Sequence, residues 1–328
     1  MKPREPEPKQ DGVADGVADA NTPPPVNEEA ARLVHRIHTV RPLPKGLRRP
    51  LSPKRGGAPG AELTNLAVVT GASSGIGAAF ARRLAQGGKD LLLTARRKNR
   101  LETLALELES RNGIRCQIHD ADLSRDDEVT GLLKQMDELG PASLVVHSAG
   151  FGTRALFHEV DPQKPPDMIA VHDTAPVRLF RHTLPAMRRS GYGGLILVSS
   201  LAAFYTTKRY TMYSATKAFA NMFCRGLFDE LKGTGVKVQA LCPGLTRTEF
   251  FSAPDYAKFD YDRVPDFMWM EPAEVVEESL QALAKNRRPV FIPGRANRLF
   301  VKTMESKVVG EALNLGLGVA ERIFGELW

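Results

Sequence analysis

Seven short apolar segments alternate with longer segments of helical spacing, and this alternation restricts the fold more than any other feature of the chain. The apolar segments lie at residues 65–70, 90–95, 114–121, 143–149, 194–200, 236–242 and 289–293. Continuous apolar strands separated by helices are typical of a parallel sheet covered on both faces. The sequence therefore predicts an α/β fold with one doubly wound, seven-stranded parallel sheet over residues 63–293. Any ligand should sit beyond the carboxyl ends of the strands.

The flanking segments differ in composition from this domain. Residues 1–62 are rich in Pro, Gly and charge and contain the repeat DGVADGVAD, so we expect a disordered basic extension. Residues 294–328 are predicted to form a helical extension. Its last part, 311–328, carries an apolar stripe suited to packing on the body or on a subunit partner. The glutamates on its outer face disfavour a membrane surface.

Charge and cysteine content exclude several classes of protein. The net charge is +7, and residues 30–61 carry eight basic residues and no acid. Such a run is typical of a solvated tail, so no nucleic-acid partner is expected. Three scattered cysteines fit neither a disulfide framework nor a zinc site, which indicates a reducing, cytoplasmic setting without a metal. The beginning of the chain has no signal-peptide pattern, and no apolar run approaches the roughly 20 residues of a membrane span.

A glycine-rich turn, TGASSGIG, follows the first strand and opens the first helix. Glycines in this pattern let the backbone approach a phosphate, and a helix N-terminus favours negative charge. A P-loop is excluded because no G-K-[ST] follows. The residues predicted to contact a cofactor in this turn are Gly71, Ser73, Ser74, Gly75, Ile76 and Gly77.

The end of the second strand selects between the two nicotinamide cofactors. An acid there would bind the ribose 2′-hydroxyl of NAD, whereas this chain has Arg96 followed by Arg97. A guanidinium suits a 2′-phosphate, which favours NADP(H), although both arginines could simply begin a solvated helix. After the third strand, Asp122 and Leu123 are candidate adenine contacts, and Asp122 could equally be a helix cap.

Three side chains with complementary chemistry follow the fifth strand. Ser200 closes the strand, Tyr213 comes 13 residues later, and Lys217 lies four residues after Tyr213. Positions i and i+4 share one face of a helix, so the lysine can favour the phenolate form of the tyrosine. Tyr205 and Arg209 have the same spacing, but they fall in the loop before the helix.

Together with PGLTRT at 243–248, these motifs resemble the short-chain dehydrogenase/reductase family in its classical form, over about residues 63–293. The resemblance implies a Rossmann-type fold and an oxidoreductase that transfers a hydride between NADP(H) and a carbonyl or secondary alcohol. It implies Tyr213 as the acid/base, Ser200 as the donor that orients the carbonyl, and Lys217 as a ribose ligand. The further cofactor contacts that it implies are Ser148, Ala149, Gly150, Pro243, Gly244, Thr246 and Thr248.

Two positions depart from the family pattern. The chain has HSAG at 147–150 where Asn-Asn-Ala-Gly is usual, and it has His172 where an Asn is usual. An imidazole at 172 could hold a water beside Lys217, so His172 is a candidate catalytic residue of the proton relay. The departures also support an alternative function, a non-catalytic NADP-binding scaffold with a degenerate site.

Residues 249–270 form a long segment rich in aromatic side chains. In family members the segment at this place covers the substrate. We expect an apolar lid over a small-molecule carbonyl or alcohol. The side chains expected in the lid are Phe250, Phe251, Tyr256, Phe259, Tyr261, Phe267 and Trp269. A homo-oligomer, either a dimer or a tetramer, is also expected.

Overall fold

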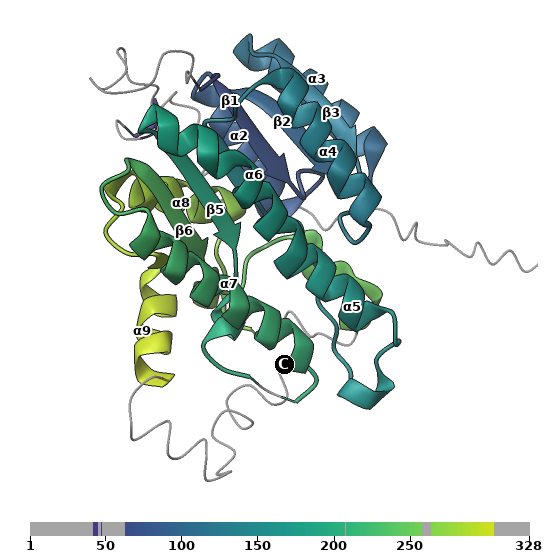
Figure 1. Ribbon diagram of the computed structural model, residues 1–328. Coiled ribbons are helices and arrows are strands. Elements are labelled where there is room, and N and C mark those ends of the chain that lie inside the picture. Colours follow the sequence, from purple (N-terminus) through teal and green to yellow (C-terminus); the bar gives the residue numbers. More distant parts are fainter. Residues whose placement is uncertain (1–41, 45–46, 48–62, 207, 258–263, 305–328) are drawn as a thin grey trace, which may run out of the picture. The chain divides into compact units, whose positions relative to one another are not determined.

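The computed structural model describes residues 42–44, 47, 63–206, 208–257 and 264–304. Within these residues seven parallel strands form one sheet in the spatial order β3-β2-β1-β4-β5-β6-β7 (Figure 1). The strands are β1 (Leu66–Thr70), β2 (Asp90–Ala95), β3 (Cys116–Asp120), β4 (Leu144–His147), β5 (Gly193–Val198), β6 (Val236–Leu241) and β7 (Val290–Phe291). The strand order reverses between β1 and β4, as in a doubly wound Rossmann-type sheet. The predicted fold class is confirmed.

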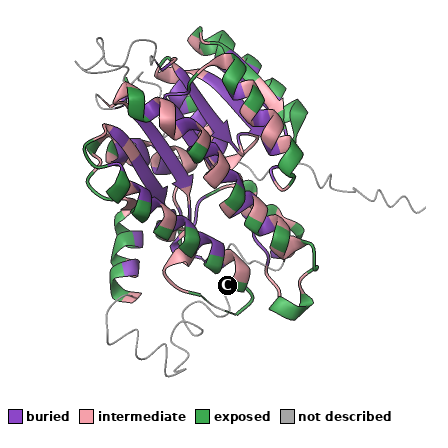
Figure 2. Cartoon of the chain, viewed as in Figure 1, coloured by how far each residue is buried: buried purple, intermediate pink, exposed green. Residues whose placement is uncertain are grey.

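The central strand β1 illustrates why the apolar runs are continuous rather than alternating. Val68 lies opposite Leu92 of β2 on one side and opposite Val145 of β4 on the other. All five β1 residues are buried, because helices cover both of its faces. Figure 2 shows the same contrast across the domain, with buried strands inside and exposed outer helix surfaces.

Helices form one layer on each face of the sheet. One layer consists of α2 (Gly75–Gln86), α3 (Lys98–Asn112) and α8 (Pro272–Lys285). The other consists of α4 (Asp126–Leu139), α6 (Ala175–Ser190) and α7 (Thr211–Glu230). Phe80 and Leu84 of α2 share one buried cluster with Leu280 of α8, whereas Phe180 of α6 and Cys224 of α7 belong to the second. The sheet thus separates two hydrophobic cores.

An irregular turn interrupts the helix that follows β4. The short helix α5 (Lys164–Ile169) continues through a π-helical turn, Ala170–Thr174, directly into α6. A π turn inserts one extra residue into a helix and is often found at functional sites. Here it carries His172 and Asp173, and it packs against α7.

The extensions are only partly covered by the described residues. Leu43 and Leu47 fall within the predicted disordered segment 1–62, yet both are buried in the core cluster that contains α2. Of residues 1–62, the structure describes 42–44 and 47, and the others lie outside the described residues. The C-terminal extension begins with α9 (Arg295–Met304), and its predicted amphipathic part at 311–328 also lies outside them. Within the described part of the chain, no helix combines the length and hydrophobicity that a membrane span requires.

Candidate active site

The glycine-rich turn after β1 packs directly on the backbone that follows β4. A Cβ atom at Gly71 would lie 2.7 Å from the Ala149 nitrogen, and one at Gly77 would lie 2.2 Å from the Gly71 carbonyl oxygen. The Thr70 hydroxyl accepts from the Ser148 and Ala149 amides, each at 3.1 Å. These contacts leave no room for larger residues, so the turn is shaped for close backbone approach at the carboxyl edge of the sheet.

Ser200, Tyr213 and Lys217 come together at the carboxyl end of β5. Tyr213 and Lys217 lie one turn apart on α7, with the Lys217 Nζ atom 5.5 Å from the centre of the Tyr213 ring. The ammonium donates to the Val198 carbonyl at 3.1 Å, and the Lys217 carbonyl accepts from the Ser199 hydroxyl at 2.9 Å. The Ser200 hydroxyl accepts from the Ala202 amide at 3.1 Å, and its interaction with Tyr213 favours the phenolate form. Lysine and tyrosine are therefore anchored together at the strand end.

Burial sets the protonation of this group. It raises the pKa of Tyr213 to about 12, although the hydrogen bond with Ser200 acts in the opposite direction. Burial also lowers the pKa of Lys217 to about 8, against the attraction of the Asp173 carboxylate. Tyr213 is therefore a phenol that can donate a proton, and Lys217 changes its charge close to neutrality.

The sequence does not single out Asp173, yet this residue interacts electrostatically with Lys217. Burial raises the pKa of Asp173 to about 7, and the lysine ammonium opposes that rise. Its Oδ1 atom is buried and has no hydrogen-bond partner within the described part of the chain. The position of Asp173 depends on the π turn, which the spacing of apolar residues does not predict.

Two histidines link the end of β4 to the π turn from both directions. His147 Nε2 donates to the Val171 carbonyl at 2.8 Å, and the Phe151 amide donates to His172 Nε2 at 3.1 Å. A backbone amide can only donate, so His172 Nε2 is the acceptor and Nδ1 carries the proton. That proton is directed at the Thr216 hydroxyl, with Nδ1 and Oγ1 2.9 Å apart. Each histidine thus bonds the π turn to the segment at the end of β4.

This network changes the expected role of His172. Thr216 donates to the Tyr213 carbonyl at 3.0 Å, so the imidazole supports the helical turn that carries the tyrosine. Both ring nitrogens have protein partners, and neither is left to hold a water beside Lys217. Burial lowers the pKa of His172 well below 6.5, with further contributions from Lys217 and His147. The geometry therefore describes a positioning residue and does not support the expected water relay through the ring.

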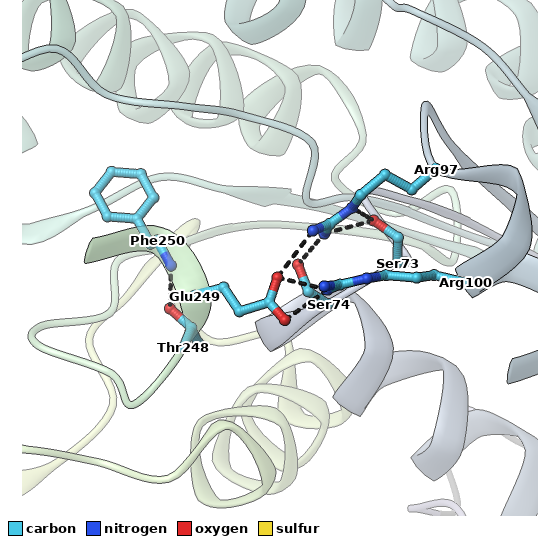
Figure 3. A network of polar contacts seen from close by, with 7 residues as sticks. All are labelled: Ser73, Ser74, Arg97, Arg100, Thr248, Glu249 and Phe250. Carbon is cyan, nitrogen blue, oxygen red and sulfur yellow. Dashed lines mark hydrogen bonds and ion pairs between the residues drawn. The ribbon is translucent and has the colours of Figure 1, made fainter. Parts of the chain in front are cut away.

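A polar network connects the start of α3 with the glycine-rich turn (Figure 3). Arg97 Nη2 donates to the Ser73 hydroxyl at 2.9 Å and to the Ser74 hydroxyl at 2.7 Å. Arg97 and Arg100 both bind the carboxylate of Glu249, at 2.9 and 2.6 Å. Arg97 is the N-cap residue of α3, and Arg100 lies in its first turn. Their closeness in sequence is a signal that could have identified the pair. Glu249, some 150 residues away, has no such signal.

The other residues predicted at the adenosine end have simpler surroundings. Arg96 is exposed and, among the described residues, has no side-chain hydrogen bond or ion pair. Asp122 Oδ1 accepts from the amide and the hydroxyl of Ser124, at 3.0 and 2.8 Å, which is the geometry of a local cap. Leu123 is buried in the core cluster around α4. Contacts of Asp122 and Leu123 with adenine remain a prediction.

Aromatic side chains of the predicted lid cover Tyr213. The Phe250 ring lies 5.8 Å from the Tyr213 ring and 5.2 Å from the Tyr256 ring, centre to centre. A Cβ atom at Gly152 would lie 2.1 Å from the Tyr256 hydroxyl, so the lid closes directly on the loop after β4. Phe251 and Trp269 belong to the same cluster. Phe267 is 75% exposed, and Phe259 and Tyr261 lie outside the described residues.

Comparison with known proteins assigns the chain to a family. The family model described as short chain dehydrogenase matches residues 65–255. The chain belongs to the short-chain dehydrogenase family. An uncharacterized oxidoreductase of Staphylococcus saprophyticus is 32% identical to this short-chain dehydrogenase over 219 residues, which are 66% of this chain and 90% of that protein. The resemblance drawn from the sequence motifs is confirmed at the level of the family and of the oxidoreductase class.

Solved structures of other family members have the same fold. A short-chain dehydrogenase from Sphingobium yanoikuyae in complex with NADPH is 31% identical, with a TM-score of 0.65, over 77% of this chain and 96% of that one. An alcohol dehydrogenase from Thermococcus sibiricus complexed with 5-hydroxy-NADP is 28% identical, with a TM-score of 0.60, over 70% and 96%. A bulky-bulky ketone specific alcohol dehydrogenase from Comamonas testosteroni is 27% identical, with a TM-score of 0.62, over 76% and 95%.

The residues predicted for the short-chain dehydrogenase site fall into two spatial groups. The first lies around Tyr213 at the ends of β4, β5 and β6, and the second lies around the glycine-rich turn. Thr248 joins the groups, because a Cβ atom at Gly75 would lie 3.0 Å from its methyl carbon. Pro243, Gly244 and Thr246 occupy the turn after β6, and Thr246 donates to the Gly244 carbonyl at 3.0 Å.

Proposed function

We propose that this chain is an NADP(H)-dependent oxidoreductase acting on an apolar carbonyl compound or the matching secondary alcohol. The observation that carries the proposal is the grouping of Ser200, Tyr213 and Lys217 at the carboxyl edge of the sheet, beside a glycine-rich turn. NADPH and an NADP analogue are bound in the Sphingobium and Thermococcus relatives.

The residues present fit such a cofactor. Gly71 and Gly77 let the turn pack tightly at the start of α2, and a helix N-terminus favours an anion such as a pyrophosphate. Ser73, Ser74 and Arg97 form a donor set suited to a phosphate. Arg96, the preceding residue in the chain, is exposed. A bound nicotinamide supplies or accepts the hydride.

The remaining chemistry falls to side chains of this chain. In the direction of reduction, Tyr213 donates its phenolic proton to the carbonyl oxygen, and the Ser200 hydroxyl donates a hydrogen bond to the same oxygen. The Lys217 ammonium stabilises the phenolate that results. His172 holds the Tyr213 turn in place through Thr216. The aromatic side chains Phe250 and Tyr256 exclude water and favour an apolar substrate.

The test is NADPH oxidation by the purified protein with a panel of ketones and aldehydes, combined with two matched variants. Tyr213→Phe removes one hydroxyl and should abolish turnover while NADPH still binds. Tyr205→Phe is the control, because Tyr205 lies in the preceding loop, with its ring 5.5 Å from the Phe300 ring. NADPH binding without turnover on any carbonyl would instead favour the non-catalytic scaffold. Equal activity of the two variants would refute Tyr213 as the acid/base.

We further propose that the chain forms a homo-oligomer through α7. Phe219 is 40% exposed and Met222 is 67% exposed on this helix, and the Phe219 ring stacks on Phe223 at 5.8 Å. Large apolar side chains grouped on one exposed helix surface are suited to a subunit contact. Light scattering of the wild type and of Met222→Glu tests this. A monomer in the wild type would contradict the proposal.

A further inference from the structure

Glu249 connects the two ends of the candidate active site. It directly follows Thr248, which packs on Gly75, and it begins the short 3₁₀ turn Glu249–Ser252 of the lid. In Figure 3 its carboxylate lies between the guanidinium groups of Arg97 and Arg100, while the next residue, Phe250, points away from them. One carboxylate thus joins the lid segment to the helix that follows β2.

The carboxylate occupies a site that is built for an anion. Two guanidinium groups reach it, and Arg97 also binds the hydroxyls of Ser73 and Ser74 in the glycine-rich turn. Arginine binds carboxylate and phosphate oxygens through the same N–H donors. Partial burial acts against ionisation of Glu249, but the hydrogen bonds to Arg100 and Arg97 hold its pKa below the ordinary value. Glu249 is therefore an anion at neutral pH.

We infer that Glu249 competes with the ribose 2′-phosphate of NADP(H) for Arg97 and Arg100, and that cofactor binding releases the beginning of the lid, the turn Glu249–Ser252. The inference rests on the NADP(H) dependence proposed above. The phosphate would take over the two arginines and displace the carboxylate. Release of Glu249 frees the start of the segment that places the Phe250 ring 5.8 Å from the Tyr213 ring. Occupation of the adenosine end would thereby open the substrate end.

The strength of this competition follows from the exposure of the groups. The side chains of Arg97, Arg100 and Glu249 are 45%, 47% and 49% exposed. Ion pairs of this kind are weak individually, so the carboxylate can be displaced by a phosphate with a higher charge. Removing the Glu249 charge should tighten the binding of a 2′-phosphorylated ligand by roughly 3- to 10-fold.

The first test compares Glu249→Gln with the wild type in equilibrium binding, without any substrate. The ligands are NADPH, NADH, 2′,5′-ADP and 5′-ADP. We expect tighter binding of NADPH and 2′,5′-ADP to the variant and unchanged binding of the two ligands that lack the 2′-phosphate. Asp266→Asn is the matched control, because Asp266 pairs with Arg247 at 2.7 Å in the same lid and does not touch Arg97 or Arg100.

The outcomes separate this inference from the proposed function. Unchanged affinity of Glu249→Gln for NADPH, in a protein that prefers NADPH to NADH, overturns the competition and leaves the cofactor assignment intact. Weaker binding of both cofactors to the variant means that Glu249 instead closes the lid on a bound cofactor, and this also overturns the inference. A wild type that binds neither cofactor, or binds both equally, refutes the NADP(H) dependence and the competition with it.

The second test follows the lid itself. Trp269 lies in the lid cluster, 5.8 Å from Phe251 ring to ring, and the chain has one other tryptophan, Trp328. In a Trp328→Phe background, 2′,5′-ADP should change the Trp269 emission, whereas 5′-ADP should not. Adding Glu249→Gln should produce that change before any ligand is present. Identical emission with both nucleotides would show that the 2′-phosphate does not move the lid.

Discussion

The two buried imidazoles should make the fold sensitive to acid, and His172→Asn should remove about half of that sensitivity. Burial lowers the pKa of His147 to about 3, even though the bond to Val171 favours protonation, and it lowers the pKa of His172 well below 6.5. Each folded-state pKa lies below the value of about 6.5 in the unfolded chain. As the pH falls below about 6.5, each histidine binds a proton in the unfolded chain but not in the folded protein, so the free energy of unfolding decreases.

The size of this change in the free energy of unfolding follows from the protons that the folded protein does not bind. Between pH 7 and pH 5, a histidine with an unfolded pKa of about 6.5 that stays neutral in the folded state reduces the free energy of unfolding by about 2 kcal/mol. His147 and His172 together therefore remove about 4 kcal/mol. Asp173 acts in the opposite direction, because its folded pKa of about 7 exceeds the unfolded value. Its protonation returns at most about 2 kcal/mol over the same interval, and less after screening by solvent.

The assay is urea unfolding at pH 7, 6 and 5, followed by circular dichroism, for the wild type and His172→Asn. The variant should be less stable at pH 7, because it loses ring packing and weakens the bonds to Phe151 and Thr216. The difference between the two proteins should shrink by about 2 kcal/mol at pH 5. His158→Asn, at an exposed histidine, should follow the wild type at every pH. Parallel pH profiles for wild type and His172→Asn would falsify the buried, proton-excluding ring.

Two further predictions concern the glycine-rich turn and the thiols. Gly77→Ala places a Cβ atom 2.2 Å from the Gly71 carbonyl oxygen, so we expect a loss of stability of about 1–3 kcal/mol and NADPH binding weakened more than tenfold. Thermal unfolding and cofactor titration check this, and an unchanged affinity would mean that the turn does not approach the cofactor. Burial raises the pKa of Cys116 and of Cys242 to about 12 and raises that of Cys224 as well, so the native protein should react very slowly with a thiol reagent, whereas the urea-unfolded protein should release three equivalents. Rapid reaction of a native thiol would contradict the burial.

Local patterns carry the parts of the fold that the sequence predicts correctly. The apolar runs indicate the strands, and all seven appear in one parallel sheet within the described residues. The four-residue spacing of Tyr213 and Lys217 places them on one face of α7. Each of these inferences depends on residues that are near neighbours in the chain, and periodicity reports such neighbours directly.

Contacts between distant segments account for what the sequence does not predict. Arg96 and Arg97 are adjacent and chemically identical, and only the fold decides that Arg97 turns toward Ser73 and Ser74. Glu249 reaches Arg97 across 152 positions of sequence, so no local pattern could have paired them. The sequence suggests that His172 could hold a water. The structure buries its ring in a π turn, and such a turn has no recognised spacing of apolar residues that would have predicted the burial.

The reciprocal bonds between β4 and the π turn also restrict how this chain can drift in evolution. His147 donates forward to the Val171 carbonyl, and His172 reaches back to accept from the Phe151 amide. A Cβ atom at Gly150 would lie 2.8 Å from His172 Nε2. Exchange of one imidazole for the shorter amide that the family usually carries would already weaken the contact between the two segments to which the other imidazole contributes. The two positions should therefore be epistatic, with the double exchange less harmful than the sum of the single ones. Lineages that carry one histidine here should tend to carry both.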